Sequence, residues 1–164
     1  MLYNCDIGPI RIKASDGYVN ELCFLEGDTL KAPEVPEQPD VSTDPVLVEC
    51  VRQLDEYFEG RRQLFSLPLK QEGTPFQQKV WAALLKIPFG KTISYRELSQ
   101  RIGDTNAIRA VGRANGKNQL AILVPCHRVI GSDQSLTGYA GGMARKRWLL
   151  DHENKYAHGD RLLF

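Results

Sequence analysis

The stretch "TISYRELSQRIGDTNAIRAVGRANGKN", residues 92–118, decides the fold of the C-terminal half, because it predicts two short helices separated by a turn. Ser94 and Glu97 form a Ser-x-x-Glu capping box that begins the first helix, and Gly103 ends it. Two short helices joined by a Gly-containing turn are typical of a helix-turn-helix, although many small helical proteins also contain such pairs.

The second of these helices combines small residues with arginines. Its small residues are Ala107, Ala110, Gly112 and Ala114. Arg109 and Arg113 are long and lie four residues apart, on one face of the helix. A helix with so little bulk can bring its backbone close to a narrow surface, and its arginines favour an anionic one.

The charges of the chain divide along its length. Residues 1–85 hold 8 Lys+Arg and 14 Asp+Glu, a net of −6, whereas residues 86–148 hold 11 and 3, a net of +8. The last sixteen residues hold 2 and 3, which brings the chain to +1. A concentrated basic segment is what a polyanionic partner requires, and a solvated surface with chance clustering is the alternative.

Composition indicates a soluble globular protein, with 42% hydrophobic and 25% charged residues. No apolar run approaches the roughly 18 residues that span a bilayer, and the N-terminus lacks a basic segment followed by an apolar one. We therefore expect a cytoplasmic protein without a membrane segment. The four cysteines are scattered and form no C-x-x-C pair, so we expect thiols rather than a disulfide framework.

The N-terminal half predicts a small α/β domain over residues 1–70. "PIRIKAS" and "YVNELCFL" are strand-like and flank the turn signal Asp16-Gly17, and residues 26–45 predict a proline-rich loop. "PVLVECVRQLDEYFEG" has helical periodicity ending at Gly60, and "FSLPL" predicts a further short strand.

The C-terminal domain is predicted to span residues 74–164 and to be mostly α-helical. In "GTPFQQKVWAALLKIPFGK", Thr74, Pro75 and Gln77 form a capping box with proline at the first helical position. The residues expected to form the buried stripe of this helix are Phe76, Val80, Leu84 and Leu85.

"ILVPCHRVI", residues 122–130, places a cysteine beside a histidine. Pro125 favours an extended Val124, so "LAILV" predicts a buried strand that stops at the proline and presents Cys126 at a cavity. His127 could accept the thiol proton, and Glu153 or Asp151 could orient the imidazole. A buried thiol beside a satisfied histidine is the alternative, and zinc is less favoured because no second Cys/His pair lies at ligand spacing.

The segments "FQQKVWAALLKIPFGKTISYRELSQRIG" and "AIRAVGRANGKNQLAILVPCHRVIGSDQSLTGYAGGMARKRWLLDHE" closely resemble the O6-alkylguanine-DNA alkyltransferases, also called methylated-DNA–protein-cysteine methyltransferases. The combination of "RAVG", "PCHRVI" and "GYAGG" carries the resemblance over residues 74–153. It implies a small α/β N-terminal domain followed by a winged-helix-like domain with a helix-turn-helix. It also implies direct, irreversible, single-turnover transfer of an alkyl group to Cys126 without a cofactor, from O6-alkylguanine and from O4-alkylthymine in duplex DNA.

The resemblance assigns roles to individual residues. Cys126 is the acceptor, His127 takes its proton through a water, and Glu153 hydrogen-bonds the imidazole. Asn118 braces the surrounding segment. Tyr95 helps to rotate the 3′ phosphate and donates to N3 of the departing guanine.

The resemblance also implies how DNA and the base are bound. Arg109 is the finger that fills the space of the flipped nucleotide as the helix enters the minor groove. The residues implied to line the DNA surface beside it are Ala110, Gly112, Arg113 and Ala114. The residues implied to form the base pocket are Pro125, Val129 through its carbonyl, Tyr139 and Ala140 through its amide.

Three further expectations follow. No zinc is expected, because all three histidines lie in the C-terminal half, away from Cys5 and Cys23. We expect a monomer in solution and leave cooperative binding along DNA open. A non-repairing alkyltransferase-like protein would lack the cysteine, and a Cys-His hydrolase would not explain the basic helix-turn-helix.

Overall fold

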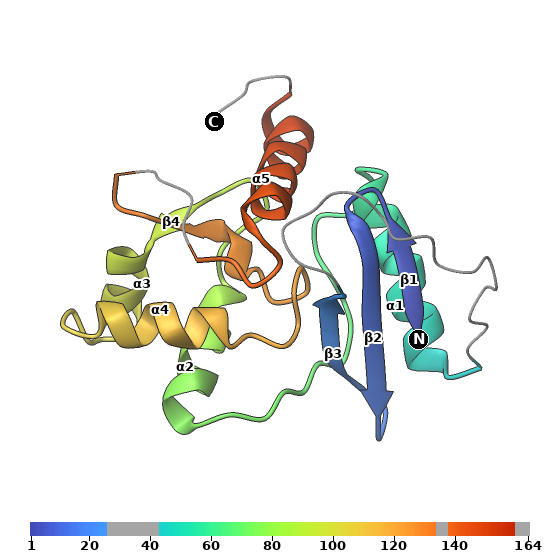
Figure 1. The fold of residues 1–164 in the computed structure, drawn as a ribbon, viewed down its shortest axis with the longest axis horizontal. Helices are drawn as coiled ribbons and strands as arrows, with labels where there is room; N and C mark the ends of the chain where they lie inside the picture. The colour runs from blue at the N-terminus through green and yellow to red at the C-terminus, as the bar shows by residue number, and fades with distance from the viewer. Residues whose placement is uncertain (26–42, 134–137, 160–164) are drawn as a thin grey trace.

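The computed structural model describes residues 1–25, 43–133 and 138–159. The proline-rich loop predicted at 26–45 falls almost entirely outside these ranges, as does the middle of the glycine-rich stretch after Cys126. A three-stranded sheet with one helix packed on it forms the N-terminal domain, and the other helices gather beside it in the C-terminal domain (Figure 1). This confirms the predicted fold class.

The N-terminal sheet is antiparallel in the order β1-β2-β3, with β1 at Leu2–Cys5, β2 at Gly8–Ser15 and β3 at Tyr18–Phe24. The predicted hairpin is confirmed. Asp16 and Gly17 both have positive φ, 53° and 81°, which is the requirement of a type I′ turn. The sequence did not predict β1, because "LYNC" does not alternate apolar and polar residues, although its positions alternate between exposed and buried in the structure.

Helix α1, Pro45–Phe58, covers the sheet by packing against β2 and β3. The side chain of Asp44 caps it by accepting from the Val46 amide, and Gly60 follows its end with a φ of 79°. The prediction of a strand at "FSLPL" is wrong. Leu69 alone makes a bridge, to Val19, because Pro68 interrupts the donors that a longer ladder needs.

Helix α2, Pro75–Leu84, begins with the predicted capping box, in which Thr74 and Gln77 satisfy each other's backbone amides. Its core residues are Val80, Trp81 and Leu84. Placing Leu85 in the buried stripe was wrong, because the helix ends at Leu84 and Leu85 is 54% exposed.

The helix-turn-helix is formed by α3, Tyr95–Arg101, and α4, Ile108–Gly116, which pack against each other and against α2. The Ser94 side chain caps α3 by accepting from the Glu97 amide, which is one half of the predicted capping box, and the Glu97 carboxylate accepts from Arg101. Strands β4, Ile93–Ser94, and β5, Val129–Ile130, form a short parallel pair that packs against α3. Helix α5, Met143–His158, lies between them and the N-terminal domain (Figure 1).

The prediction of a strand at "LAILV" is also wrong. Residues 121–123 form a turn in which Leu123 donates to the Ala121 carbonyl and Ile122 has a φ of 69°, a left-handed conformation that a β-branched residue rarely adopts. The run is apolar because the turn is buried, not because it extends through a sheet.

The start of this turn covers the edge of β3. The Leu22 amide donates to the Gln119 carbonyl at 2.8 Å, and the Ala121 amide donates to the Leu22 carbonyl at 3.0 Å. The connector at residues 68–70 covers the same edge through Val19. The segment that leads into Cys126 is therefore anchored on the N-terminal sheet.

Candidate active site

Cys126 lies in a short 3₁₀ turn, η1, formed by Cys126–Arg128 directly after Pro125. A 3₁₀ helix has about three residues per turn, so neighbouring side chains do not point to opposite faces as they do in a strand. The turn thus allows the thiol and the imidazole to serve one site. Cys126 is 6% exposed and His127 is fully buried.

The candidate base is held by a buried carboxylate. His127 Nε2 lies 2.8 Å from Glu153 Oε2, and both side chains are almost completely shielded from water. Arg128 binds the same carboxylate with two donors, Nε to Oε1 at 2.8 Å and Nη2 to Oε2 at 3.0 Å. Of the two acidic residues considered from the sequence, the structure brings Glu153 and not Asp151 to the histidine.

The electrostatics determine which imidazole nitrogen carries the proton. Burial alone would raise the pKa of Glu153, but His127 and Arg128 outweigh it and hold this pKa well below its ordinary value. Burial, together with the charges of Arg128 and Lys146, lowers the pKa of His127 although the carboxylate raises it. A neutral imidazole beside an ionised carboxylate donates from Nε2, which leaves a lone pair on Nδ1. Nδ1 is buried without a protein partner in the ranges that the structure describes, so it is placed to accept a proton.

The thiol of Cys126 does not ionise unaided. Burial raises its pKa, while Asn118, Lys146 and nearby backbone amides act in the opposite direction. Lys146 is fully buried, donates to the Val129 carbonyl at 2.6 Å, and has its pKa lowered to about 8 by burial. A largely protonated ammonium near the sulfur favours the thiolate once a base removes the proton.

Two asparagines hold the segment around Cys126. Asn118 Nδ2 donates to the carbonyls of Leu120 and Val124, at 3.3 and 2.9 Å, which is the bracing contact expected of it. Asn115 Nδ2 donates to the Cys126 carbonyl itself at 3.3 Å. Each of these carbonyls also accepts a backbone amide, so the asparagines bind the second lone pair and fix the turn.

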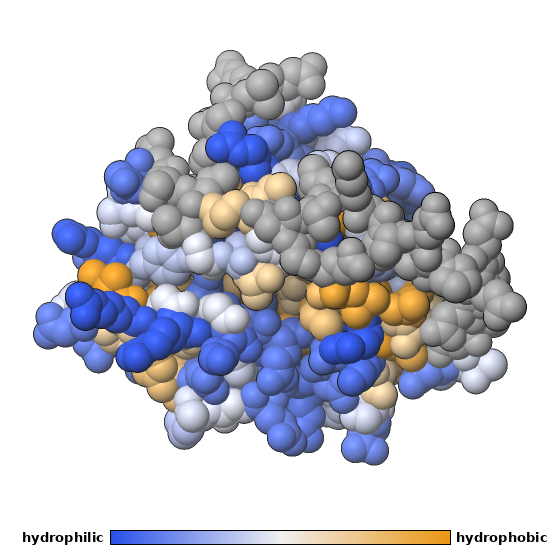
Figure 2. All heavy atoms as spheres, viewed as in Figure 1, coloured by the Kyte–Doolittle hydropathy of each residue, from blue (hydrophilic) through white to orange (hydrophobic). Residues whose placement is uncertain are grey.

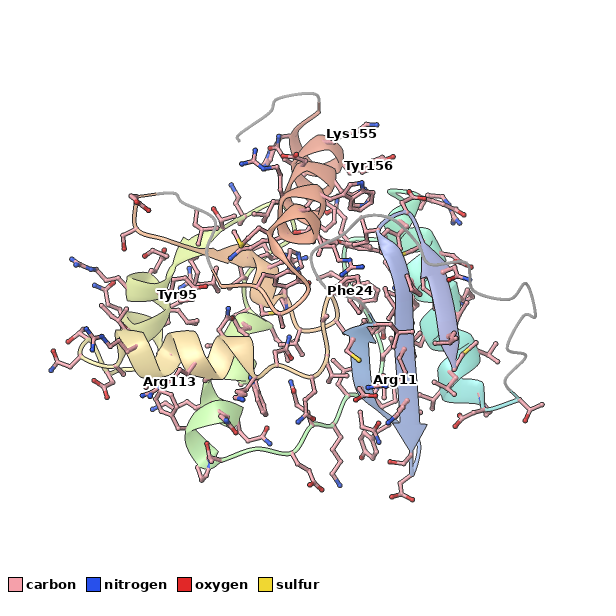
Figure 3. All side chains as sticks on the ribbon, viewed as in Figure 1. Arg11, Phe24, Tyr95, Arg113, Lys155 and Tyr156 are labelled. Atoms are coloured by element: carbon pink, nitrogen blue, oxygen red, sulfur yellow. The ribbon has the colours of Figure 1, made fainter. Side chains whose placement is uncertain are left out.

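A cavity of about 100 Å³ lies over the thiol. Cys126, Tyr139 and Ala140 line it, and strand β3 contributes its opposite wall through Leu22 to Phe24. Tyr139 packs edge to face on Phe24, with ring centroids 6.4 Å apart, and Phe24 lies at the boundary of the two domains (Figure 3). The Tyr139 hydroxyl is buried without a hydrogen-bond partner among the described residues.

The other two residues expected in the pocket lie behind it. Pro125 and Val129 are buried and are not part of the cavity wall. The Val129 carbonyl already accepts from Lys146, and a carbonyl oxygen has a second lone pair for another donor.

Helix α4 presents its arginines to solvent, and the surface over it is mainly hydrophilic (Figure 2). Arg109 and Arg113 are exposed, and Ala110 and Gly112 are partly exposed between them. Placing Ala114 on this surface was wrong. It is 3% exposed and faces α2, where its carbonyl accepts from Trp81 Nε1 at 2.9 Å, so its small size serves helix packing.

Tyr95 connects the helix-turn-helix to the cavity. A side chain added at Gly112 would contact the Tyr95 ring at 3.9 Å, and one added at Gly138, on the cavity rim, would lie 3.5 Å from its hydroxyl. Figure 3 shows Tyr95 beside α4. Tyr95 therefore lies between the exposed face of α4 and the rim of the cavity.

Comparisons with known proteins identify the family. The family model for the DNA binding domain of 6-O-methylguanine DNA methyltransferase matches residues 75–155, and that for its ribonuclease-like domain matches residues 1–71. The chain belongs to the 6-O-methylguanine DNA methyltransferase family.

Individual relatives agree with this family. The constitutive methylated-DNA–protein-cysteine methyltransferase of Bacillus subtilis is 45% identical over 148 residues, which cover 90% of each chain. A methylated-DNA–protein-cysteine methyltransferase of Methanosarcina barkeri is 46% identical, over 90% of this chain and 91% of the relative. The crystal structure of Mycobacterium tuberculosis OGT in complex with DNA superposes with a TM-score of 0.82 at 42% identity, covering 97% of this chain and 94% of that one.

Two further observations concern metals and membranes. Within residues 1–25, 43–133 and 138–159, no three His, Cys, Asp or Glu side chains lie close enough to hold a metal ion. Cys5 and Cys23 are partly buried thiols, and Cys5 donates to the Gly8 carbonyl. No helix in the described part of the chain has the length and apolar character that crossing a bilayer requires.

Sequence reasoning missed three residues of this site: Arg128, Lys146 and Asn115. Arg128 directly follows the Cys-His pair, and a basic residue there is a usable signal because it can only be buried with a partner. Lys146 and Asn115 gave no such signal, since each lies on a helix among other polar residues.

Proposed function

We propose that this protein repairs DNA by transferring an alkyl group from O6 of guanine to the sulfur of Cys126. The thiol proton passes to His127 Nδ1, with a water between them, and the sulfur attacks the alkyl carbon. The carbon–sulfur bond forms as the carbon–O6 bond breaks, and the departing guanine takes a proton at N3 from the Tyr95 hydroxyl. Because the product is a thioether, each chain acts once.

The buried His127–Glu153 pair next to Cys126 is the observation that carries this proposal. It supplies a neutral base with a fixed tautomer beside a thiol that burial keeps protonated. Transfer of an alkyl group does not require an oxyanion hole, the set of hydrogen-bond donors that an acyl-transfer site needs, because attack on an alkyl carbon forms no oxyanion intermediate. The family membership and the DNA complex of the Mycobacterium tuberculosis relative support the same chemistry.

The exposed face of α4 supports the DNA-binding part of the proposal. The protein acts as a monomer and binds the minor groove of DNA with this helix. Arg109 inserts into the stack of bases while the damaged nucleotide rotates out of the duplex and into the cavity. Beside Arg109, the exposed Arg113 and the partly exposed Ala110 and Gly112 lie against the DNA backbone. O4-alkylthymine is a second substrate of the same pocket.

Duplex DNA carrying radiolabelled O6-methylguanine tests the transfer. We expect label on the protein, at most one per chain, and none with Cys126→Ser. Cys23→Ser is the matched control, because Cys23 also lines the cavity, and it should transfer normally. Label that stays on DNA with wild-type protein, or that moves equally to Cys126→Ser, would reject the proposal.

Arg109→Ala tests the flipping role separately. Loss of the finger should slow repair of duplex DNA much more than reaction with the free base O6-benzylguanine, because only the duplex reaction needs an unstacked nucleotide. Arg113→Ala, one turn along the same exposed face, should weaken binding more evenly. Equal losses in both assays for Arg109→Ala would remove the finger role.

A further inference from the structure

One tyrosine of the N-terminal domain reaches the buried carboxylate that binds His127. Tyr57, near the end of α1, is fully buried, and its hydroxyl donates to Glu153 Oε2 at 2.6 Å across a sequence separation of 96 residues. The Tyr57 carbonyl accepts from His152 Nε2 at 2.8 Å. Main chain and side chain thus fix this tyrosine to two successive residues of α5.

The oxygen that Tyr57 binds is the one that orients the base. Glu153 Oε2 also faces His127 Nε2 at 2.8 Å and Arg128 Nη2 at 3.0 Å. An ionised carboxylate only accepts, so the phenol must be the donor. Because the donors share the negative charge of one oxygen, each of them weakens the hold of that oxygen on the others.

We propose that Tyr57 is a positioning residue for alkyl transfer, holding Glu153 so that His127 keeps its base nitrogen, Nδ1, toward the acceptor and limiting the pull of the carboxylate on the imidazole proton. The inference deepens the proposed function and rests on it. In this proposal the N-terminal domain positions the base of the site, although none of its residues is a reacting group.

The surroundings of the pair are charged on several sides. The titratable and charged groups that face it are Tyr57 from α1, Cys126 and Arg128 from η1, Tyr139 at the cavity, and Lys146 and His152 from α5. Removing the Tyr57 hydroxyl takes away one hydrogen-bond donor to Glu153 Oε2. The other groups stay in place, because phenylalanine keeps the ring contacts with Phe65 and Phe89.

The test is the pH dependence of Cys126 alkylation in Tyr57→Phe. Iodoacetamide measures thiolate at the Cys126 peptide by mass spectrometry, independently of any DNA substrate. With one donor fewer, Glu153 holds the imidazolium more strongly, and the pH midpoint should fall by about 0.5 unit or more, roughly a threefold change in the protonation equilibrium. Single-turnover transfer from O6-benzylguanine at pH 8 should slow about threefold or more, because the base is less well oriented.

Tyr3→Phe is the matched control. Tyr3 is also a buried N-terminal tyrosine that donates to a carboxylate of α1, Asp55, at 2.8 Å, but it lies outside the site. It should lower the melting temperature and leave the pH profile unchanged. If Tyr57→Phe also lowers only the melting temperature, with a profile that superimposes on wild type, the positioning role is wrong. If wild-type protein fails to react with O6-benzylguanine, the proposed function fails, and the iodoacetamide profile still decides the role of Tyr57.

Discussion

Arg145 offers a test of how strongly the two domains depend on each other. Its side chain is fully buried, donates from Nε to the Ile7 carbonyl at 2.7 Å and from Nη1 to the Gly141 carbonyl at 3.1 Å, and lies over the Phe24 ring at 4.7 Å. Gly8 leaves the room for it, since a side chain there would come within 2.9 Å of the guanidinium. One cation thus joins the N-terminal sheet to the glycine loop that forms the cavity wall.

We expect Arg145→Met to destabilise the protein by about 3 kcal/mol. Two hydrogen bonds from a charged donor contribute about 3–6 kcal/mol together, and removing the cost of burying the cation offsets part of this loss. For a chain of this size, about 3 kcal/mol corresponds to a melting temperature lower by about 6–12 °C.

Thermal unfolding followed by circular dichroism measures the effect, and urea unfolding gives the free energy directly. Arg147→Met is the matched control, because Arg147 lies two positions along the same helix and is exposed, so its loss should change stability by no more than about 0.5 kcal/mol. If Arg145→Met melts within about 2 °C of wild type, the buried cation is not what joins the domains.

Three other perturbations test separate parts of the structure. His127→Ala should slow alkyl transfer by about 10²–10⁴-fold in single-turnover assays, as loss of a general base does, and a change under threefold would contradict its role. Burial lowers the pKa of His127 and of His152, so below pH 6.5 the unfolded chain binds protons that the folded chain does not. Stability should therefore fall as pH falls from about 6.5, by up to about 1.4 kcal/mol per pH unit for each histidine, and equal urea midpoints at pH 7.5 and 5.5 would argue against this. Thr74→Ala should cost about 1 kcal/mol by calorimetry, whereas Thr74→Ser should retain most of the cap; equal melting of all three proteins would show that the capping box adds nothing.

Local signals predicted the local structure of this chain. The capping box at Thr74, the Ser94 cap and the Asp16-Gly17 turn each depend on a few adjacent residues, and each occurs as predicted. The failure at residues 120–124 has the opposite cause. An apolar run before a proline fits a buried strand and a buried turn equally well, and the contact with Leu22 that selects the turn comes from the other domain.

The same distinction applies to the site. The adjacency of Cys126 and His127 is visible in the sequence, which also offered Glu153 and Asp151 as partners, and the resemblance to a family selected Glu153. Tyr57 and Arg145 make their contacts with partners 96 and 138 residues away, and no periodicity or spacing reports such a pairing. Such residues become visible only when the elements are placed in space.

The covered edge of β3 has a consequence for synthesis. The strand is complete at Phe24, whereas the residues that pair with Leu22 are Gln119 and Ala121, so about a hundred residues separate an edge from its cover. At about 5–20 residues per second, a ribosome needs on the order of 5–20 s to bridge that interval. Residues 68–70 can cover the Val19 end of the edge earlier, but the Leu22 end stays uncovered for this time, and an uncovered sheet edge can pair with another chain. The turn before Cys126 therefore also completes the cover of a sheet edge that was made about a hundred residues earlier.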